Sequence, residues 1–192
     1  MAKRYEFKQD RQSTGFFSKL YLTKKQRRSI LRWALYSLLL LTLSVIQDVI
    51  LCRISIYGAT TDLVSCGILL ICVLEGAQKS CIFALIASML LLFSGGAPGP
   101  YAIVFLTGLA IFAAVFREAY LQRGLLAHLV CVAMGMLLYV LCNFVMGVFL
   151  RLTLPDRIWG FLITAGLTTP VALILHPICT SIEALGGDTW KE

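Results

Sequence analysis

The sequence has 192 residues, of which 59% are hydrophobic and only 14% are charged, and its mean hydropathy is +0.85. A soluble domain of this length needs far more polar surface to cover its core, so these values exclude most soluble enzymes and predict an integral membrane protein. The formal net charge is +7, and the basic excess lies in the first 32 residues.

Residues 1–29 are predicted to form a basic cytoplasmic tail, because 10 of the first 32 residues are Lys or Arg and only 2 are acidic. Since an apolar run follows directly, we expect anionic lipid headgroups, and not nucleic acid, to bind this tail. Each basic residue near a membrane surface contributes about 1 kcal/mol. An amphipathic patch at 16–22 is compatible with an interfacial helix. No small-x-small cleavage site follows, so we expect the first span to stay in the mature protein.

Apolar runs fill residues 30–182 and predict one all-α membrane domain, a compact bundle of about six transmembrane helices at 30–51, 63–74, 80–93, 101–116, 124–150 and 158–182. The second and third runs have 12 and 14 residues, whereas a span needs about 20. They are therefore either a hairpin of two short helices or one long broken helix. Glycines and prolines at 94–100 predict a sharp turn. Pro170 and Pro177 are expected to kink the last span, and 183–192 form a short cytoplasmic tail.

The distribution of basic residues favours six spans over five. With six spans and an inner N-terminus, 14 basic residues lie inside and 3 outside, whereas five spans give 12 and 4. Five spans would also leave Lys79 at membrane depth, where a charge is costly. We therefore expect a multi-pass membrane protein with both termini in the cytoplasm.

A few polar residues interrupt the apolar runs and are candidates for contacts. Gln47 and Asp48 near the outer end of the first span are either interfacial residues or contacts to a partner or substrate. Glu75 and Lys79 have the spacing of a helical ion pair, but Gly76 between them favours a solvated cytoplasmic turn. Asn143 in the fifth span is expected to form an interhelical hydrogen bond.

The segment from Arg117 to Arg123 is predicted to be a polar loop. His128 and His176 fall near the inner ends of their spans, without polar partners in sequence that would make a proton relay. The seven cysteines include no C-x-x-C pair and are interpreted as small packing residues.

No enzyme motif is present in the sequence. It contains no G-x-S-x-G elbow, no H-E-x-x-H pair and no Walker sequence. We therefore expect no catalytic residue, no cofactor and no metal site, and predict a non-enzymatic protein.

Residues 47–101 contain spans and turns in a defined order. The first span ends near Gln47, and an aspartate, Asp62, opens the second. A glycine turn at Gly76 follows, and the third span runs into the turn Ser94-Gly95-Gly96-Ala97-Pro98-Gly99 before Tyr101 opens the fourth. In this order of features the segment resembles the MreD family of rod shape-determining proteins. The chain departs from the family pattern at Thr61, where a proline is common. It also departs at Ala84, Ser88 and Leu91, where the family carries glycines and an aspartate.

The resemblance implies a fold similar to the substrate-binding subunits of energy-coupling factor vitamin transporters. It also implies a location in the bacterial plasma membrane and a scaffold or regulatory role in cell-wall elongation, in which helix faces bind partner membrane proteins and control cell shape. The implied partners are an MreC-like scaffold protein, an MreB-like filament, a RodA-like glycosyltransferase and a penicillin-binding transpeptidase. The candidate partner or structural residues are Gln47, Asp48, Asp62, Gly76, Pro98 and Gly99.

The alternative function is the substrate-binding subunit of such a vitamin transporter. That function requires a polar and aromatic pocket near the outer face, and the outer loops here are short. It also requires small residues spaced four apart on the first span for docking to the energising subunit. Only Ala34 and Ser37 precede a leucine run there. Both features count against the alternative.

Overall fold

The structure of the protein is a computed structural model that describes residues 24–53, 59–121 and 124–185. The amphipathic patch at 16–22 lies outside these residues. Within them the chain is helical, with two short 3-10 turns, η2 (Leu51–Arg53) and η3 (Pro155–Arg157). The α-helices are α1 (Lys24–Val49), α2 (Leu63–Glu75), α3 (Ala77–Phe93), α4 (Tyr101–Tyr120), α5 (Leu125–Phe149) and α6 (Ile158–Leu185). The predicted all-α fold class is thus confirmed.

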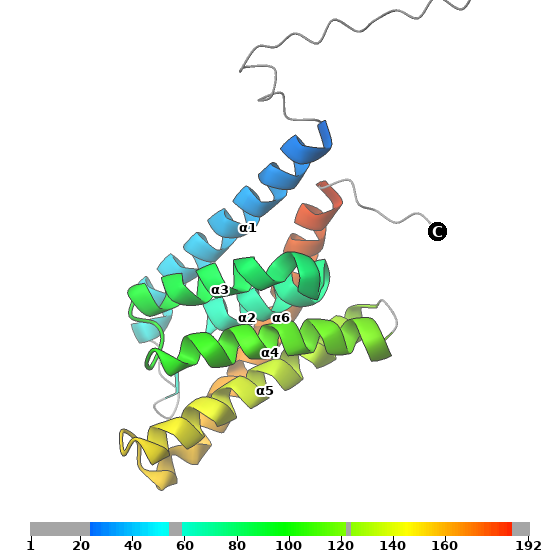
Figure 1. Ribbon diagram of the computed structural model, residues 1–192. Helices are drawn as coiled ribbons and strands as arrows, with labels where there is room; N and C mark the ends of the chain where they lie inside the picture. Colours follow the sequence, from blue (N-terminus) through cyan, green and yellow to red (C-terminus); the bar gives the residue numbers. More distant parts are fainter. Residues whose placement is uncertain (1–23, 54–58, 122–123, 186–192) are drawn as a thin grey trace, which may run out of the picture.

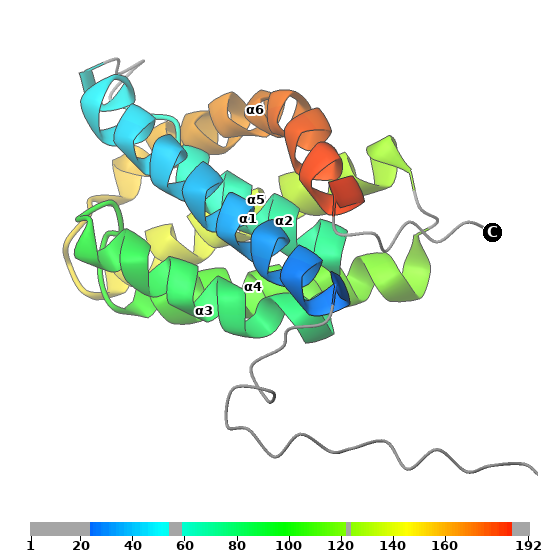
Figure 2. The same cartoon turned by 90° about the horizontal axis from the view of Figure 1, so that it is seen from above.

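Helix α2 lies at the centre of the bundle. All its residues from Leu63 to Leu74 are buried, and it packs against each of the other five α-helices. The continuous apolar run of this segment is explained by that position, because a helix enclosed on every side has no face for polar residues. Figure 1 shows α2 behind α3 and α4, and Figure 2 shows α1 crossing over it beside α6.

The chain between residues 63 and 93 forms a hairpin of two helices and not one broken helix. Gly76 alone separates α2 from α3, and its φ of 86° lies in the left-handed region that favours glycine. The two helices then pack against each other. These two helices, with 13 and 17 residues, are shorter than the other four α-helices.

Four helices are long and apolar enough to cross a membrane by length and composition, namely α1, α4, α5 and α6. The chain therefore has the helices of a membrane protein. α6 continues as one helix through Pro170 and Pro177, and Figure 2 shows it curving along its length, as expected where proline removes a helical hydrogen bond.

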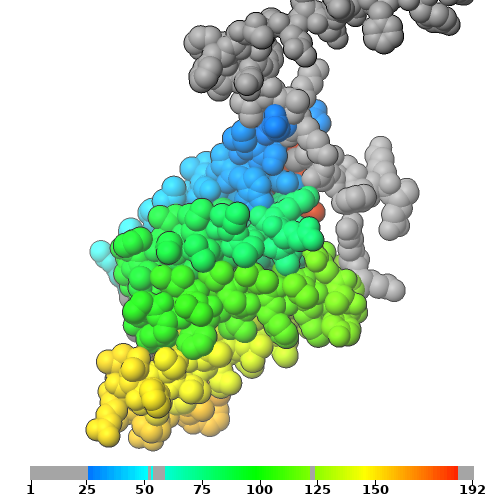
Figure 3. Space-filling model, in the orientation of Figure 1, coloured from blue at the N-terminus to red at the C-terminus, as the bar shows by residue number. Residues whose placement is uncertain are grey.

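The helix ends gather at two opposite ends of the bundle. The described residues that connect α1 to α2, α3 to α4 and α5 to α6 lie at one end, which we call the long-loop end. The described residues that connect α2 to α3 and α4 to α5 lie at the other end with the first residues of α1 and the last of α6, which we call the terminal end (Figure 1). In Figure 3 the space-filling surface of α3 and α4 covers much of the face in view, and the α5–α6 connection projects at its lower corner.

Candidate functional site

A cavity of about 700 Å³ opens at the long-loop end, between α1, α5, α6 and the three connections. We call it the long-loop cavity. Three predicted candidates from separate parts of the chain line it, namely Gln47 from α1, Asp62 before α2 and Pro98 from the α3–α4 turn. A volume of this size is typical of small-molecule sites, which range from about 300 to 1,000 Å³.

Gln47 and Asp62 also fix the start of α2. The Val64 amide donates to Gln47 Oε1 over 3.1 Å, and the Ser65 amide donates to Asp62 Oδ1 over 3.1 Å. The first amides of a helix have no partner within it, so these two side chains supply the missing acceptors. Burial raises the pKa of Asp62 above its usual value, and the hydrogen bonds at Ser65 partly oppose that shift.

The connection before α2 is also joined to α6, because the Asp62 amide donates to Thr168 Oγ1 over 3.1 Å. The position of Asp62 is therefore set from two sides, by α2 and by α6. This is a structural role for a residue that also lines the cavity.

Asn143 and Tyr139 line the cavity from α5 and are almost fully buried, with 5% and 3% of their surface exposed. The predicted interhelical hydrogen bond of Asn143 is wrong, because its Nδ2 donates to the Tyr139 carbonyl one turn earlier in the same helix, over 3.0 Å. Oδ1 of Asn143 is buried without a hydrogen-bond partner among the described residues. The sequence marked Asn143 as a polar interruption but gave no sign that it borders a cavity.

The remaining candidates at this end lie apart from the cavity or shape its turn. Asp48 is exposed on α1, and Ser44 donates a hydrogen bond of 3.4 Å to its carboxylate. A Cβ at Gly99 would come within 2.6 Å of the Tyr101 ring. Gly99 therefore allows that ring to lie close to the backbone at the start of α4.

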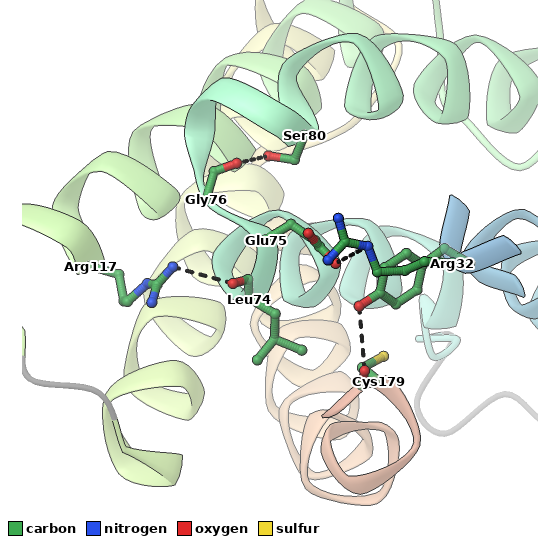
Figure 4. A network of polar contacts seen from close by, with 8 residues as sticks. Arg32, Leu74, Glu75, Gly76, Ser80, Arg117 and Cys179 are labelled. Atoms are coloured by element: carbon green, nitrogen blue, oxygen red, sulfur yellow. Dashed lines mark hydrogen bonds and ion pairs between the residues drawn. The ribbon is translucent and has the colours of Figure 1, made fainter. Parts of the chain in front are cut away.

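At the terminal end, the prediction that Glu75 belongs to a solvated turn is wrong. Its carboxylate lies 3.2 Å from Arg32 Nε, and only 2% of the Glu75 side chain and 4% of that of Arg32 are exposed. Figure 4 shows the ion pair between Arg32 of α1 and Glu75 at the end of α2. Apolar packing explains the burial, since Arg32 starts the apolar part of α1 just as Glu75 ends that of α2.

Arg117 is likewise misplaced by the sequence prediction of a polar loop. It lies within α4, 7% of it is exposed, and its Nη2 donates to the Leu74 carbonyl over 3.4 Å. On the other side of the turn, Ser80 Oγ donates to the Gly76 carbonyl over 2.7 Å. Polar side chains thus satisfy the backbone on both sides of Gly76 (Figure 4).

The two histidines meet at the terminal end, a contact that their separation in sequence did not indicate. His128 Nδ1 lies 3.2 Å from His176 Nε2, so one ring nitrogen donates to the other. The pair joins the start of α5 to the last third of α6. No group of three or more metal-ligating side chains occurs within residues 24–53, 59–121 and 124–185.

Comparison with known proteins gives no relative for this chain, since no protein-family profile, curated protein or solved structure matches it.

Proposed function

We propose that the protein is a non-enzymatic membrane scaffold or regulatory subunit of the bacterial cell-wall elongation machinery. The proposal rests on the resemblance of residues 47–101 to the MreD family. It acts by binding partner membrane proteins through the faces of its helices and thereby controls where wall is made. Its partners in this proposal are an MreC-like scaffold protein, an MreB-like filament, a RodA-like glycosyltransferase and a penicillin-binding transpeptidase.

The observation that carries the proposal concerns the central helix. Gln47 and Asp62, which contribute to the resemblance, cap the first turn of α2, and Gly76, which also contributes, ends the helix with a positive φ. Residues that carry the resemblance are therefore the ones that fix α2, the helix that every other α-helix contacts.

The proposed orientation follows from the basic residues at the two ends of the bundle. Arg27, Arg28 and Lys79 belong to the terminal end, whereas Arg151 and Arg157 belong to the long-loop end. The sequence before α1 contains five further Lys and Arg residues. Since basic residues favour the cytoplasmic side, we place the terminal end in the cytoplasm and the long-loop end outside.

The proposed binding mode follows from the outward faces of the long helices. Leu38, Leu41 and Val45 are exposed on α1. Only 22% of the most apolar stretch of this helix is buried inside the bundle, so most of it faces outward. α6 is buried to the same extent. In a bilayer such faces meet either lipid or a partner helix, and close packing is what favours the partner.

The first test is affinity purification of the tagged full chain from its native cell in mild detergent, with mass spectrometry of the proteins recovered. We expect an MreC-like protein and wall polymerases, enriched over an unrelated membrane protein carrying the same tag. Recovery of neither would contradict the proposal.

A second candidate function is the substrate-binding subunit of an energy-coupling factor vitamin transporter. The long-loop cavity favours it, because it lies at the end assigned to the outside and has aromatic and polar lining residues. The same purification separates the two candidates, since a transporter subunit would bring with it a pair of ATPases and a coupling membrane protein.

A further inference from the structure

The two histidines form a polar contact between α5 and α6 at the terminal end of the bundle. His128 Nδ1 lies 3.2 Å from His176 Nε2, so the two nitrogens share one hydrogen. His128 is partly exposed near the start of α5, whereas His176 in the last third of α6 is only 9% exposed. The sequence contains no other histidine. Any titration of an imidazole in this chain therefore arises at this contact.

The contact depends on the number of protons that the two rings carry. A neutral imidazole has one N–H and one lone pair, so two neutral rings form a hydrogen bond. One added proton leaves this bond in place, because an imidazolium donates to the remaining neutral ring, and the charge strengthens the bond. A second proton removes the accepting lone pair, since both nitrogens of an imidazolium are donors. Two positive charges and two N–H groups then face each other, and the contact becomes repulsive.

Other charged and titratable groups lie on each helix that packs against the pair. Described groups at this end are Arg117, Glu118 and Tyr120 of α4, Cys72 and Glu75 of α2, the basic first turn, Arg32 and Tyr36 of α1, Cys131 of α5, and Cys179 and Glu183 of α6. Arg117 acts electrostatically on Cys131, one turn after His128. Carboxylates generally change charge below about pH 5, and thiols and phenols above about pH 8. An imidazole changes charge between these limits, so the histidines respond in the neutral range.

Both histidines lie where helical hydrogen bonding is incomplete. Pro177 follows His176 and has no amide hydrogen, so it makes no hydrogen bond to the carbonyl one turn earlier in α6. Gly124 precedes α5 and has no side chain that could cap the first amides of this helix. At the long-loop end, Phe144 and Phe161 join the same two helices through a ring contact that does not titrate. The terminal end of the helix pair can therefore open while the other end stays closed.

We propose that the contact between His128 and His176 is a proton-sensitive latch between the start of α5 and the last third of α6. The latch is closed while at least one ring is neutral, and it opens when both rings carry a proton. The open state takes up the second proton more readily, so the latch weakens as the pH falls from about 7 to about 5. This inference goes beyond the scaffold function and does not depend on it. With the terminal end in the cytoplasm, as proposed above, the latch responds to acidification of the cytoplasm.

Amide side chains provide variants that keep the contact but do not titrate. Asparagine carries its amide where histidine has Nδ1, and glutamine carries its amide where histidine has Nε2. His128→Asn and His176→Gln therefore replace the nitrogen that each ring uses in the contact. An amide oxygen accepts from an imidazolium, so each single variant should keep the contact closed at low pH. Leu126→Gln is the control, because it adds an amide at a position near the start of α5 that is 76% exposed, and keeps both histidines.

The test is hydrogen–deuterium exchange of the purified full-length protein in detergent micelles, corrected at each pH for the intrinsic exchange rate. In the wild type we expect amide exchange in 124–132 and 172–185 to rise about tenfold between about pH 6.5 and about pH 5.5. An opening that takes up one proton gains up to about tenfold for each pH unit. Exchange around Phe144 and Phe161 should stay constant. Leu126→Gln should behave as the wild type, whereas His128→Asn and His176→Gln should show no rise. A metal chelator in every sample keeps metal ions from bridging the two rings.

Three results would overturn the proposal. The first is unchanged exchange of the wild type over this pH range, and the second is an equal rise in a folded His128→Asn or His176→Gln variant. The third is a rise that includes the segments around Phe144 and Phe161, because it would indicate general unfolding in acid. Each single variant decides by itself, so one that does not fold leaves the other as the test. If neither folds, a rise confined to 124–132 and 172–185 in both the wild type and Leu126→Gln supports the latch, and its absence overturns it.

Discussion

Arg32 and Glu75 bring opposite charges into a part of the bundle from which solvent is excluded. Their contact at 3.2 Å offsets the cost of burying both charges, but each charge depends on the other being present. The Tyr36 hydroxyl beside them donates to the Cys179 carbonyl over 3.4 Å, which adds α6 to the same cluster. Single polar contacts thus join α1, α2 and α6.

Removing one member of this pair is expected to be costly. Glu75→Ala leaves Arg32 buried without its carboxylate and should lower the free energy of unfolding by about 3–5 kcal/mol. The double variant Arg32→Leu with Glu75→Leu removes both charges and should cost clearly less. Denaturation in mixed detergent micelles measures both. Equal losses in the two variants would show that the charges are not coupled.

The acidic candidates Asp48 and Asp62 differ in what they contact, and this difference is testable. Asp62→Ala removes an acceptor from the first turn of α2 and should destabilise the protein by about 1 kcal/mol. Asp48→Ala, on an exposed position of α1, should change stability by less than about 0.5 kcal/mol. The same denaturation assay compares them, and a larger effect at Asp48 would contradict the assignment.

At the scale of elements, the turn between α2 and α3 depends on a backbone conformation. Gly76→Ala places a Cβ at a φ of 86° and should destabilise the fold by about 1–2 kcal/mol. Gly108→Ala is the control, because Gly108 lies inside α4 with open space around it. It should be neutral or stabilising by up to about 1 kcal/mol. Melting curves in detergent decide whether the two changes have opposite signs.

Several helix starts follow from local chemistry and were predictable. Asp62 precedes α2, and the glycine and proline run at 94–100 separates α3 from α4. Pro155 opens the short turn that leads into α6. Caps and breakers act over a few residues, so the sequence alone contains the information.

Other helix ends were less predictable because hydropathy marks membrane depth and not helicity. α1 begins at Lys24 and α3 at Ala77, several residues before the apolar runs at 30 and 80. α4 continues through Arg117 to Tyr120. Charged residues in these turns remain helical since Lys, Arg and Glu are good helix formers.

The site could be predicted only in part, because tertiary packing assembles it from distant segments. Gln47, Asp62 and Pro98 were singled out as separate positions, and only tertiary packing brings them to one cavity. The pairing of Arg32 with Glu75, and of His128 with His176, also joins distant segments. For Arg32 and Glu75 the sequence held one signal, because it predicts these opposite charges at the cytoplasmic ends of two different spans.

For the molecule as a whole, we expect six crossings of the membrane with both termini inside. Reporters fused within 94–100 and 150–154 should be found outside, and reporters at 122–123 and at the C-terminus inside. A reporter inserted next to Gly76 is decisive, because six crossings place it inside and five do not. An outside signal there would mean that α2 and α3 do not each cross the membrane.

We propose that the protein works as a scaffold of wall elongation, and depleting it from its native cell is the decisive test. Cell outline and the position of new wall are followed by microscopy, with the wild-type chain restored as the control. We expect depleted cells to become round, new wall to lose its pattern along the cell, and restoration of the wild-type chain to reverse both. Depleted cells that stay rod-shaped but grow only when a vitamin is supplied in excess would contradict the claim and support the transporter function.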